Sequence, residues 1–332
     1  MFKKHIDKIG RVTLFFANRK LFTCKSLCYF REKRKFGKIY AERFDENFTP
    51  DKIKYIIEYR FCKRIGYDLD MDNPKSFNEK IKWLKFNYHN PLVTKCADKY
   101  RAREYIADKI GPEYLVDLHG VYDNADEIDF EKLPDQFVLK VNWGCKQNII
   151  CRSKKNLDIK YVREKLRKWM MPSENHYFWE FEWGYKDIKP KIICEKYMPE
   201  ISDGTAEFEF FCFNGEPKWI MVRGFDKRGR PIADDFDINF KRLPFTRKRT
   251  HAKGCSAGPV SKPRELKKML ELCRVLSAPF PLVRINIYRL KHGLKIGELT
   301  FTPGDGKDKF KPQEWDFKIG EWLKLPEKRV AE

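Results

Sequence analysis

The chain has 332 residues, enough to bury a sizeable core in one large domain or in two to three smaller lobes. Aromatic residues make up 15% of it and charged residues 35%, which excludes a disordered chain and indicates a globular protein with an ionic surface. Lysine and arginine number 69 against 48 acidic residues, a formal charge of +21. This charge predicts an anionic partner, and nucleic acid, acidic membrane, nucleotide and acidic glycan all qualify.

The first 45 residues form a basic segment. Residues 1–40 carry a net charge of +10, and their apolar stretch 12–17 is too short for a signal peptide or a membrane span. One interpretation is an amphipathic segment lying on an anionic membrane surface, and the other is a basic helix packed on the body. The ten cysteines lie mostly in apolar runs, as in reduced cytoplasmic proteins, and the lone pair Cys24 and Cys28 does not predict a zinc site.

Residues 46–110 are predicted to be helical. Apolar residues recur at helical spacing over 51–65, and Gly66 ends that helix. Ser76 and Glu79 have the spacing of a capping box and predict the start of a second helix. A third helix is expected over 94–110, and Gly111-Pro112 breaks it.

The pattern then changes to short apolar runs of strand length. We expect a smaller α+β lobe over 111–198, with strands at 114–121, 136–141, 148–152 and 191–198 and a helix at 158–170. A larger α+β lobe is expected over 199–332. In that lobe Asn214-Gly215 predicts the turn of a hairpin joining 208–213 to 219–222, and a helix over 261–277 has Pro263 in its first turn.

A second hairpin, residues 282–306, carries the polar residues of greatest interest. In its first strand, Arg284, Asn286 and Tyr288 alternate with apolar residues and share one face. His292-Gly293 makes the turn, and the returning strand is expected to send Ile296, Glu298 and Thr300 to a single face. Arg284, Asn286, Glu298 and Thr300 would then converge across the strand pair.

Such a cluster supplies oxygen ligands and one fixed cation. Magnesium prefers carboxylate and amide oxygens, and arginine grips phosphate through two parallel hydrogen bonds. The alternative for this hairpin alone is a polar face turned to water.

Two further segments suit phosphate and nucleotide. Residues 137–144 form a strand that delivers Lys140 and then a loop, so an ammonium and backbone N–H groups can meet phosphate oxygens. Residues 191–198 form a strand that ends in Glu195 and a polar hinge, where backbone groups can hold an adenine edge.

These three segments, in this order, resemble the ATP-grasp enzymes and, within them, the TupA-like family associated with teichuronopeptide and other surface-polymer synthesis. The matched motifs run from about Asn73 to Pro326, and they include NPKSFNEKIKWL at 73–84, ADKY at 97–100, LP and FVLK at 133–140, FCFNG at 211–215 and GELTFTPG at 297–304. The resemblance implies two α+β lobes around a nucleotide cleft. It also implies that ATP phosphorylates a carboxylate, which an amine then attacks to give an amide.

The resemblance also implies roles for single residues. Lys140 would meet the α-phosphate, Arg284 the transferring phosphate, and both are the expected catalytic residues. Asn286 and Glu298 would hold magnesium. The residues expected to bind the ATP cofactor are Lys140, Lys146, Glu195, Lys196 and Tyr197.

Three positions depart from the family pattern. Asn286 stands where an aspartate is usual, which removes one negative charge from the metal site. Glu209 stands where a lysine is usual, so a cation near phosphate has become an acid. In the loop after Lys140, Trp143 and Lys146 replace small residues, although the charge of Lys146 favours phosphate.

The sequence therefore leaves two functions open. One is a cytoplasmic, magnesium-dependent ligase of surface polysaccharide synthesis that acts on an acidic glycan or an amino acid. The other is a degenerate ATP-grasp fold that binds a nucleotide or sugar nucleotide as a glycosyltransferase-like or scaffold protein. Nucleic acid is not an expected partner, because no recognition motif is present. The sequence carries no signal for an oligomeric state.

Overall fold

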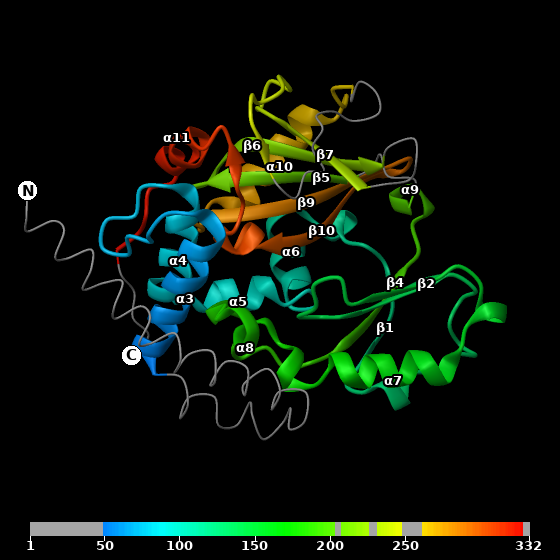
Figure 1. Cartoon of the computed structure of the whole chain (residues 1–332). Helices are drawn as coiled ribbons and strands as arrows, with labels where there is room; N and C mark the ends of the chain where they lie inside the picture. Colours follow the sequence, from blue (N-terminus) through cyan, green and yellow to red (C-terminus); the bar gives the residue numbers. More distant parts are fainter. Residues whose placement is uncertain (1–48, 203–206, 226–230, 248–260, 328–332) are drawn as a thin grey trace, which may run out of the picture.

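The computed structural model describes residues 49–202, 207–225, 231–247 and 261–327 (Figure 1). The basic segment 1–45, with Cys24 and Cys28, lies outside these ranges. The helices of the described part are α3 (Pro50–Ile65), α4 (Phe77–Asn87), α5 (Pro91–Ala97), α6 (Ala102–Ile110), α7 (Ile159–Trp169), α8 (His176–Glu180), α9 (Pro199–Ser202), α10 (Leu266–Ser277) and α11 (Glu314–Trp322).

A four-stranded antiparallel sheet occupies the lower half of Figure 1, with α7 beneath it. Its strands are β1 (Leu118–Tyr122), β2 (Phe137–Val141), β3 (Asn148–Cys151) and β4 (Ile192–Lys196), in the order β1-β4-β2-β3. Phe137, Leu139 and Val141 alternate inward along β2 and pack against Val162 and Leu166 of α7. The alternation of apolar residues thus gives the small sheet one buried face.

A five-stranded antiparallel sheet occupies the upper half of Figure 1. Its strands are β5 (Glu207–Phe213), β6 (Glu216–Phe225), β7 (Pro231–Phe236), β9 (Leu282–Leu290) and β10 (Gly293–Thr300), in the order β10-β9-β5-β6-β7. The apolar residues of β9 pack with α10 and α6 in one core. β8 (Thr246–Arg247) and β11 (Phe310–Lys311) form a separate two-stranded sheet.

A predicted helix cap and a predicted hairpin turn are both confirmed. The Ser76 hydroxyl accepts from the Glu79 backbone N–H while the Glu79 carboxylate accepts from the Ser76 backbone N–H, so the capping box is complete. Asn214 and Gly215 both have positive φ, 50° and 85°, and join β5 to β6 as a two-residue hairpin turn.

Two helix predictions are wrong. The third helix is interrupted, because Asp98 ends α5 in an extended conformation and its side chain accepts hydrogen bonds from the N–H groups of Tyr100 and Arg101. Such local bonding by aspartate competes with the helix. The helix expected from residue 261 begins only at Leu266, so Pro263 precedes it.

The hairpin of β9 and β10 contains a bulge that the alternation did not predict. The register shifts between Ile296 and Glu298, so Ile296 joins the core while Glu298 and Thr300 lie opposite Asn286 and Arg284. The prediction that Ile296 shares their face is therefore wrong. Gly297 permits the bulge, since a Cβ there would lie 2.7 Å from the Tyr288 ring.

The predicted α+β class is confirmed by two antiparallel sheets with separate helices. Of the strand predictions, 136–141 and 148–152 match β2 and β3 within a residue, whereas β1 begins at Leu118 and follows a short 3-10 turn. Within the described ranges, no helix has the length and apolar character needed to cross a membrane.

Candidate functional site

Arg284 is the centre of a buried polar cluster on the larger sheet. Its Nη2 donates to Glu298 Oε1 at 2.8 Å and to Thr300 Oγ1 at 3.0 Å, and its Nη1 lies 3.3 Å from Glu209 Oε2. These contacts join the three neighbouring strands β5, β9 and β10. We name Arg284, Glu209, Asn286, Glu298 and Thr300 the Arg284 cluster.

The charges of this cluster stabilise one another. Burial by itself raises the pKa of Glu298, but Lys99, Arg284 and the Thr300 hydroxyl outweigh it and lower that pKa to about 2. Burial by itself lowers the pKa of Arg284, but Glu209 and Glu298 raise it above its ordinary value. Glu298 and Arg284 are therefore charged throughout the physiological pH range.

Asn286 lies directly opposite Glu209 across β5 and β9. Its Nδ2 donates to Glu207 Oε1 at 2.7 Å, and its Oδ1 is buried without a hydrogen-bond partner among the residues that the structure describes. Oε2 of Glu209 is also buried without a hydrogen-bond partner in the described ranges, although Arg284 pairs with it at 3.3 Å and Arg223 pairs with Oε1. Burial and then the charge of Glu209 raise the pKa of Glu207.

The oxygens of this face fit magnesium only in part. Carboxylates at Glu209 and Glu298 and the free Asn286 Oδ1 are hard ligands of the kind that Mg²⁺ prefers. Over the described residues, however, no three Asp, Glu, His or Cys side chains are grouped closely enough to hold a metal ion. Arg284 lies between the two carboxylates and pairs with both. The donor set therefore suits a cation that brings further oxygen ligands with it, as a nucleotide-bound ion does.

The small sheet contributes a second ion pair. Lys140 on β2 binds Glu195 on β4 at 2.5 Å, and both side chains are largely buried. The charge of Lys140 also contributes to lowering the pKa of Glu298 on the larger sheet, so the two pairs act on one another electrostatically. The backbone N–H of Lys196 donates to Asp117 O at 2.9 Å, and its ammonium is exposed. Tyr197 is half-buried at the end of this strand.

The turn between β2 and β3 carries the remaining predicted residue. Lys146 has a left-handed φ of 59° and is exposed at this turn. Trp143 packs in the core of the small sheet instead, where its indole N–H donates to Trp169 O at 3.1 Å.

Lys99 was not predicted to belong to the site, yet it connects the two sheets. Its Nζ donates to Gly144 O in the β2–β3 turn at 2.7 Å and lies 3.6 Å from Glu298 Oε2. The break at Asp98 places Lys99 between the two helices and turns it toward β10. Its place in the matched segment 97–100 was the only sequence signal for it.

A search of curated proteins finds no significant match to the chain. Solved structures with similar folds include the D-alanine--D-alanine ligase from Helicobacter pylori, at 14% identity, with 76% of this chain and 70% of that chain covered and a TM-score of 0.41. The D-alanine--D-alanine ligase from Bacillus anthracis has 14% identity, coverage of 63% and 59%, and a TM-score of 0.39. The chain thus spans about three fifths of that ligase. A D-cycloserine synthetase has 14% identity, coverage of 70% and 72%, and a TM-score of 0.38.

The sequence profile of the TupA-like ATPgrasp family matches residues 79–324. This range contains both sheets and all the residues of the Arg284 cluster. The resemblance drawn from the motifs is confirmed over about three quarters of the sequence. The chain belongs to the TupA-like ATPgrasp family.

Proposed function

We propose that this protein is an ATP-dependent carboxylate–amine ligase whose nucleotide binds between the two sheets. The observation that carries the proposal is the position of Lys99, which donates to Gly144 O in the β2–β3 turn and lies 3.6 Å from Glu298 Oε2 on β10. It joins the sheet that carries the Lys140–Glu195 pair to the sheet that carries the Arg284–Glu298 pair. A triphosphate needs cations from both sides, and Lys140, Lys99 and Arg284 supply them. Membership of the ATPgrasp family supports the same function.

In this function an oxygen of the substrate carboxylate attacks the γ-phosphorus, and ADP leaves with the electron pair of the broken P–O bond. The nitrogen of an amine then attacks the carbonyl carbon of the acyl phosphate, and inorganic phosphate leaves. Lys140 contacts the α-phosphate and Arg284 the transferring phosphate. Glu298 and the Asn286 amide oxygen would hold magnesium together with ATP, and the ion would neutralise phosphate charge there. Glu195, Lys196, Tyr197 and Lys146 complete the nucleotide site.

We propose that the lobes divide at residues 111–198 and 199–332, after a helical region 46–110. The family association with surface polymers supports an acidic glycan or an amino acid as substrate, within polysaccharide synthesis in the cytoplasm. The amide product follows from the ligase chemistry.

Calorimetry tests the nucleotide site. Wild-type protein should bind Mg·ATP and show negligible heat with magnesium alone, because one carboxylate and one amide retain Mg²⁺ poorly without phosphate oxygens. Glu298→Gln should weaken Mg·ATP binding at least tenfold. Glu265→Gln is the matched control, since Glu265 pairs with Arg289 at the exposed end of β9. Absence of Mg·ATP binding by the wild type would refute the ligase.

The second candidate is a non-catalytic relative that binds a nucleotide or sugar nucleotide. The observation that favours it is Glu209, whose buried carboxylate occupies Arg284 and lies opposite Asn286. In that case Asn286→Asp alone should raise the Mg·ATP affinity little, because the charge of Glu209 still repels the phosphates. The double variant Asn286→Asp with Glu209→Lys would be needed to raise it. In a ligase, Asn286→Asp alone strengthens binding and preserves ATP turnover with the right acceptor.

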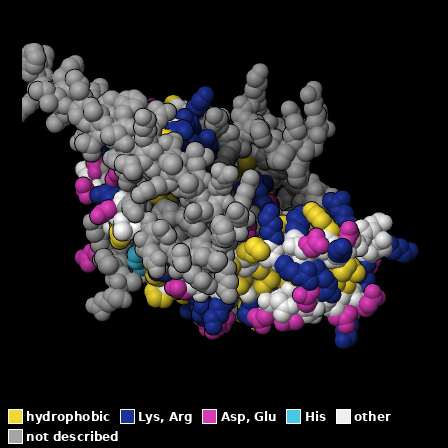
Figure 2. Space-filling model, turned by 60° about the horizontal axis from the view of Figure 1, so that its bottom comes forward, with side chains coloured by type: hydrophobic (Ala, Val, Ile, Leu, Met, Phe, Trp, Pro, Cys, Tyr) yellow, Lys and Arg dark blue, Asp and Glu magenta, His cyan; other side chains and the backbone are white. Residues whose placement is uncertain are grey.

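We further propose that the protein contacts an anionic membrane surface. Helix α7 has the sequence IKYVREKLRKW, with five basic residues and one acid. Ile159, Tyr161, Met171 and Ile150 are exposed around it, and Figure 2 shows hydrophobic patches among lysine and arginine on this lobe. The basic segment 1–40, with its net charge of +10, is proposed to contact the same surface. Sedimentation with acidic vesicles should therefore fall with added salt and on deletion of residues 1–40. Salt-insensitive sedimentation, or none, would contradict the proposal.

A further inference from the structure

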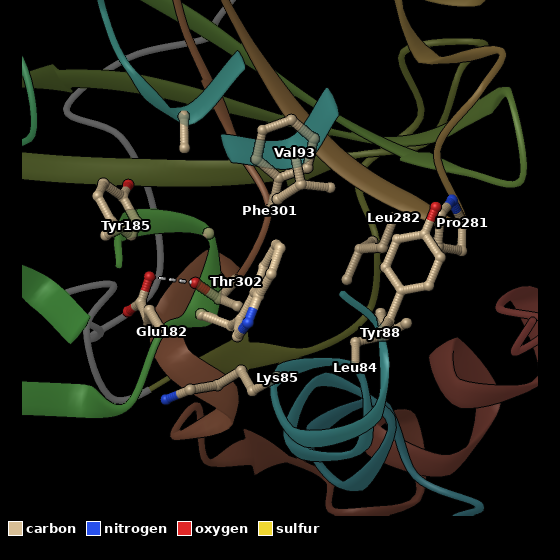
Figure 3. Close-up of a pocket in the computed structure, with 13 residues that line it drawn as sticks. Leu84, Lys85, Tyr88, Val93, Glu182, Tyr185, Pro281, Leu282, Phe301 and Thr302 are labelled. Atoms are coloured by element: carbon tan, nitrogen blue, oxygen red, sulfur yellow. Dashed lines mark hydrogen bonds between the residues drawn. The ribbon is translucent and has the colours of Figure 1, made fainter. Parts of the chain in front are cut away.

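The structure contains a cavity of about 40 Å³ (Figure 3). It is walled mainly by apolar side chains from α4, α5, the 183–185 turn, the start of β9 and the segment after β10, among them Leu84, Val93, Trp183 and Phe301. Its polar groups come from Lys85, Glu182, Tyr185 and Thr302. By the usual size of a water site, this volume holds roughly three water-sized groups. It therefore accepts a short chain and not a sugar ring.

Glu182 gives the cavity its chemical character. The Thr302 hydroxyl donates to Glu182 Oε2 at 2.5 Å, as the dashed line in Figure 3 marks. Oε1 forms no hydrogen bond with any residue in the described ranges and lies 3.9 Å from His176 Nδ1. A carboxylate in an apolar pocket needs a donor for each oxygen, and an ammonium supplies one together with the opposite charge.

Lys85 does not take that place, because its ammonium is already engaged. It pairs with Asp305 and donates to Glu180 O. Burial raises the pKa of Glu182, while Lys85 and then His176 oppose the rise. A carboxylate with a raised pKa accepts a proton more readily, which suits a general base.

The cavity also lies next to the proposed phosphoryl-transfer site. Thr302 is two residues beyond Thr300, which binds Arg284 and Glu298. Tyr185 lines the cavity, and its pKa is raised well above the usual value by burial, then by Glu182 and then by Glu298. The charges of both carboxylates therefore act on this phenol, which lines the cavity.

We propose that the cavity binds the amine substrate as a primary ammonium on a short aliphatic arm, with Glu182 as its counter-ion and general base. The proposal rests on the ligase function proposed above. The arm packs against Trp183 and Phe301, and the rest of the substrate lies outside. Specificity for a primary amine follows from the small volume and from Glu182 Oε1, which accepts no hydrogen bond from the described residues.

Glu182 takes one proton from R–NH₃⁺, which frees the nitrogen lone pair. That pair forms the N–C bond to the carbonyl carbon of the acyl phosphate. The bond between this carbon and the oxygen that bridges it to phosphorus breaks, and the electrons of that bond leave with inorganic phosphate. The phosphate takes the second proton from nitrogen, and the amide forms.

The binding of propylammonium chloride to the full chain, without ATP, tests the site. Ligand-observed NMR measures this binding, and 1-propanol serves as the neutral isostere. Wild-type protein should bind propylammonium and not propanol. Glu182→Gln should weaken binding at least tenfold. Glu180→Gln is the control and should leave it unchanged, because the Glu180 side chain pairs with Lys307 and Arg60. If Glu182→Gln fails to fold, Thr302→Val should weaken binding several-fold by releasing Glu182.

Equal binding of propanol and propylammonium would overturn the proposal, because the cavity would then be an apolar void. Equal loss in Glu180→Gln would overturn it as well, since attraction to surface charge would explain the binding. No propylammonium binding with normal Mg·ATP binding would refute the amine site and leave the ligase intact. Propylammonium binding without Mg·ATP binding would support the amine site and refute the ligase.

Discussion

Two buried charge clusters of this protein have opposite designs. In the Arg284 cluster one cation pairs with two carboxylates, Glu209 and Glu298. In the second, which we name the Asp305 cluster, one carboxylate pairs with Lys82, Lys85 and Lys307. We call the residue that pairs with several partners the hub of its cluster. Removing the hub takes the shared counter-charge from all its partners, whereas removing one partner leaves the charge of the hub neutralised by the others. The two clusters therefore predict different responses to single substitutions.

The largest expected effect comes from Arg284→Met. It leaves the buried carboxylates of Glu209 and Glu298 without their shared cation, and only Arg223 and Lys99 still pair with them. We therefore expect a loss of about 3 kcal/mol in the free energy of unfolding. Urea denaturation measures it. Arg289→Met, on the same strand, removes a half-exposed pair with Glu265 and should cost about 1 kcal/mol or less. Similar losses for both variants would contradict the role of Arg284 as a hub.

Lys85→Met should cost less, about 1–3 kcal/mol, because Lys82 and Lys307 still compensate Asp305. The lost stability reflects the hydrogen bonds to Asp305 and to Glu180 O. Chemical denaturation in the same buffer allows direct comparison with Arg284→Met. A loss larger than that of Arg284→Met would reverse the ranking of the two clusters.

The sequence predicted the Arg284 cluster better than the Asp305 cluster, and the reason is geometric. Alternation along β9 places Arg284 and Asn286 on one face, and the hairpin turn brings Glu298 and Thr300 opposite them. The bulge at Gly297 was not predictable, because it depends on the Tyr288 ring.

The Asp305 cluster joins a loop to a helix more than 200 residues away in sequence. Asp305 has a left-handed φ of 54° between two glycines that also have positive φ. No periodic pattern encodes that conformation or its contact with α4. Lys99 was missed for a related reason, since the helix break at Asp98 positions it. Local patterns predict elements and strand pairs, whereas loop contacts depend on tertiary packing.

Gly297→Ala tests whether the bulge is needed to form the Arg284 cluster. The new Cβ would lie 2.7 Å from the Tyr288 ring, so we expect a loss of about 1–3 kcal/mol. Thermal or urea unfolding measures it. Replacing Tyr288 with leucine as well should recover part of the loss, because the clash is with the ring. No recovery in the double variant would show that the backbone, and not Tyr288, requires glycine.

The smallest effect is a pH dependence that arises in the Asp305 cluster. Burial lowers the pKa of Lys82 to about 7, although Asp305 opposes the shift. Between pH 7 and the ordinary lysine pKa the unfolded chain binds more protons at this group than the folded protein. Its contribution to stability therefore rises with pH across that window.

Lys82→Met should flatten this rise. The test is the difference in unfolding free energy between wild type and variant at pH 7 and pH 9. Lys318→Met, which removes an exposed helix pair with Glu314, is the control and should leave the slope unchanged. A slope that does not change in Lys82→Met would place the titration elsewhere.

Hydrogen exchange with and without Mg·ATP tests most directly whether one nucleotide contacts both sheets. We expect backbone amides to become protected together in residues 137–147 and 192–198 of the small sheet and in residues 284–300 of the larger one, at one common nucleotide concentration. Glu298→Gln should raise the concentration at which all three segments become protected. Protection confined to one sheet, or at different concentrations for the two sheets, would contradict a nucleotide held between Lys140 and Arg284.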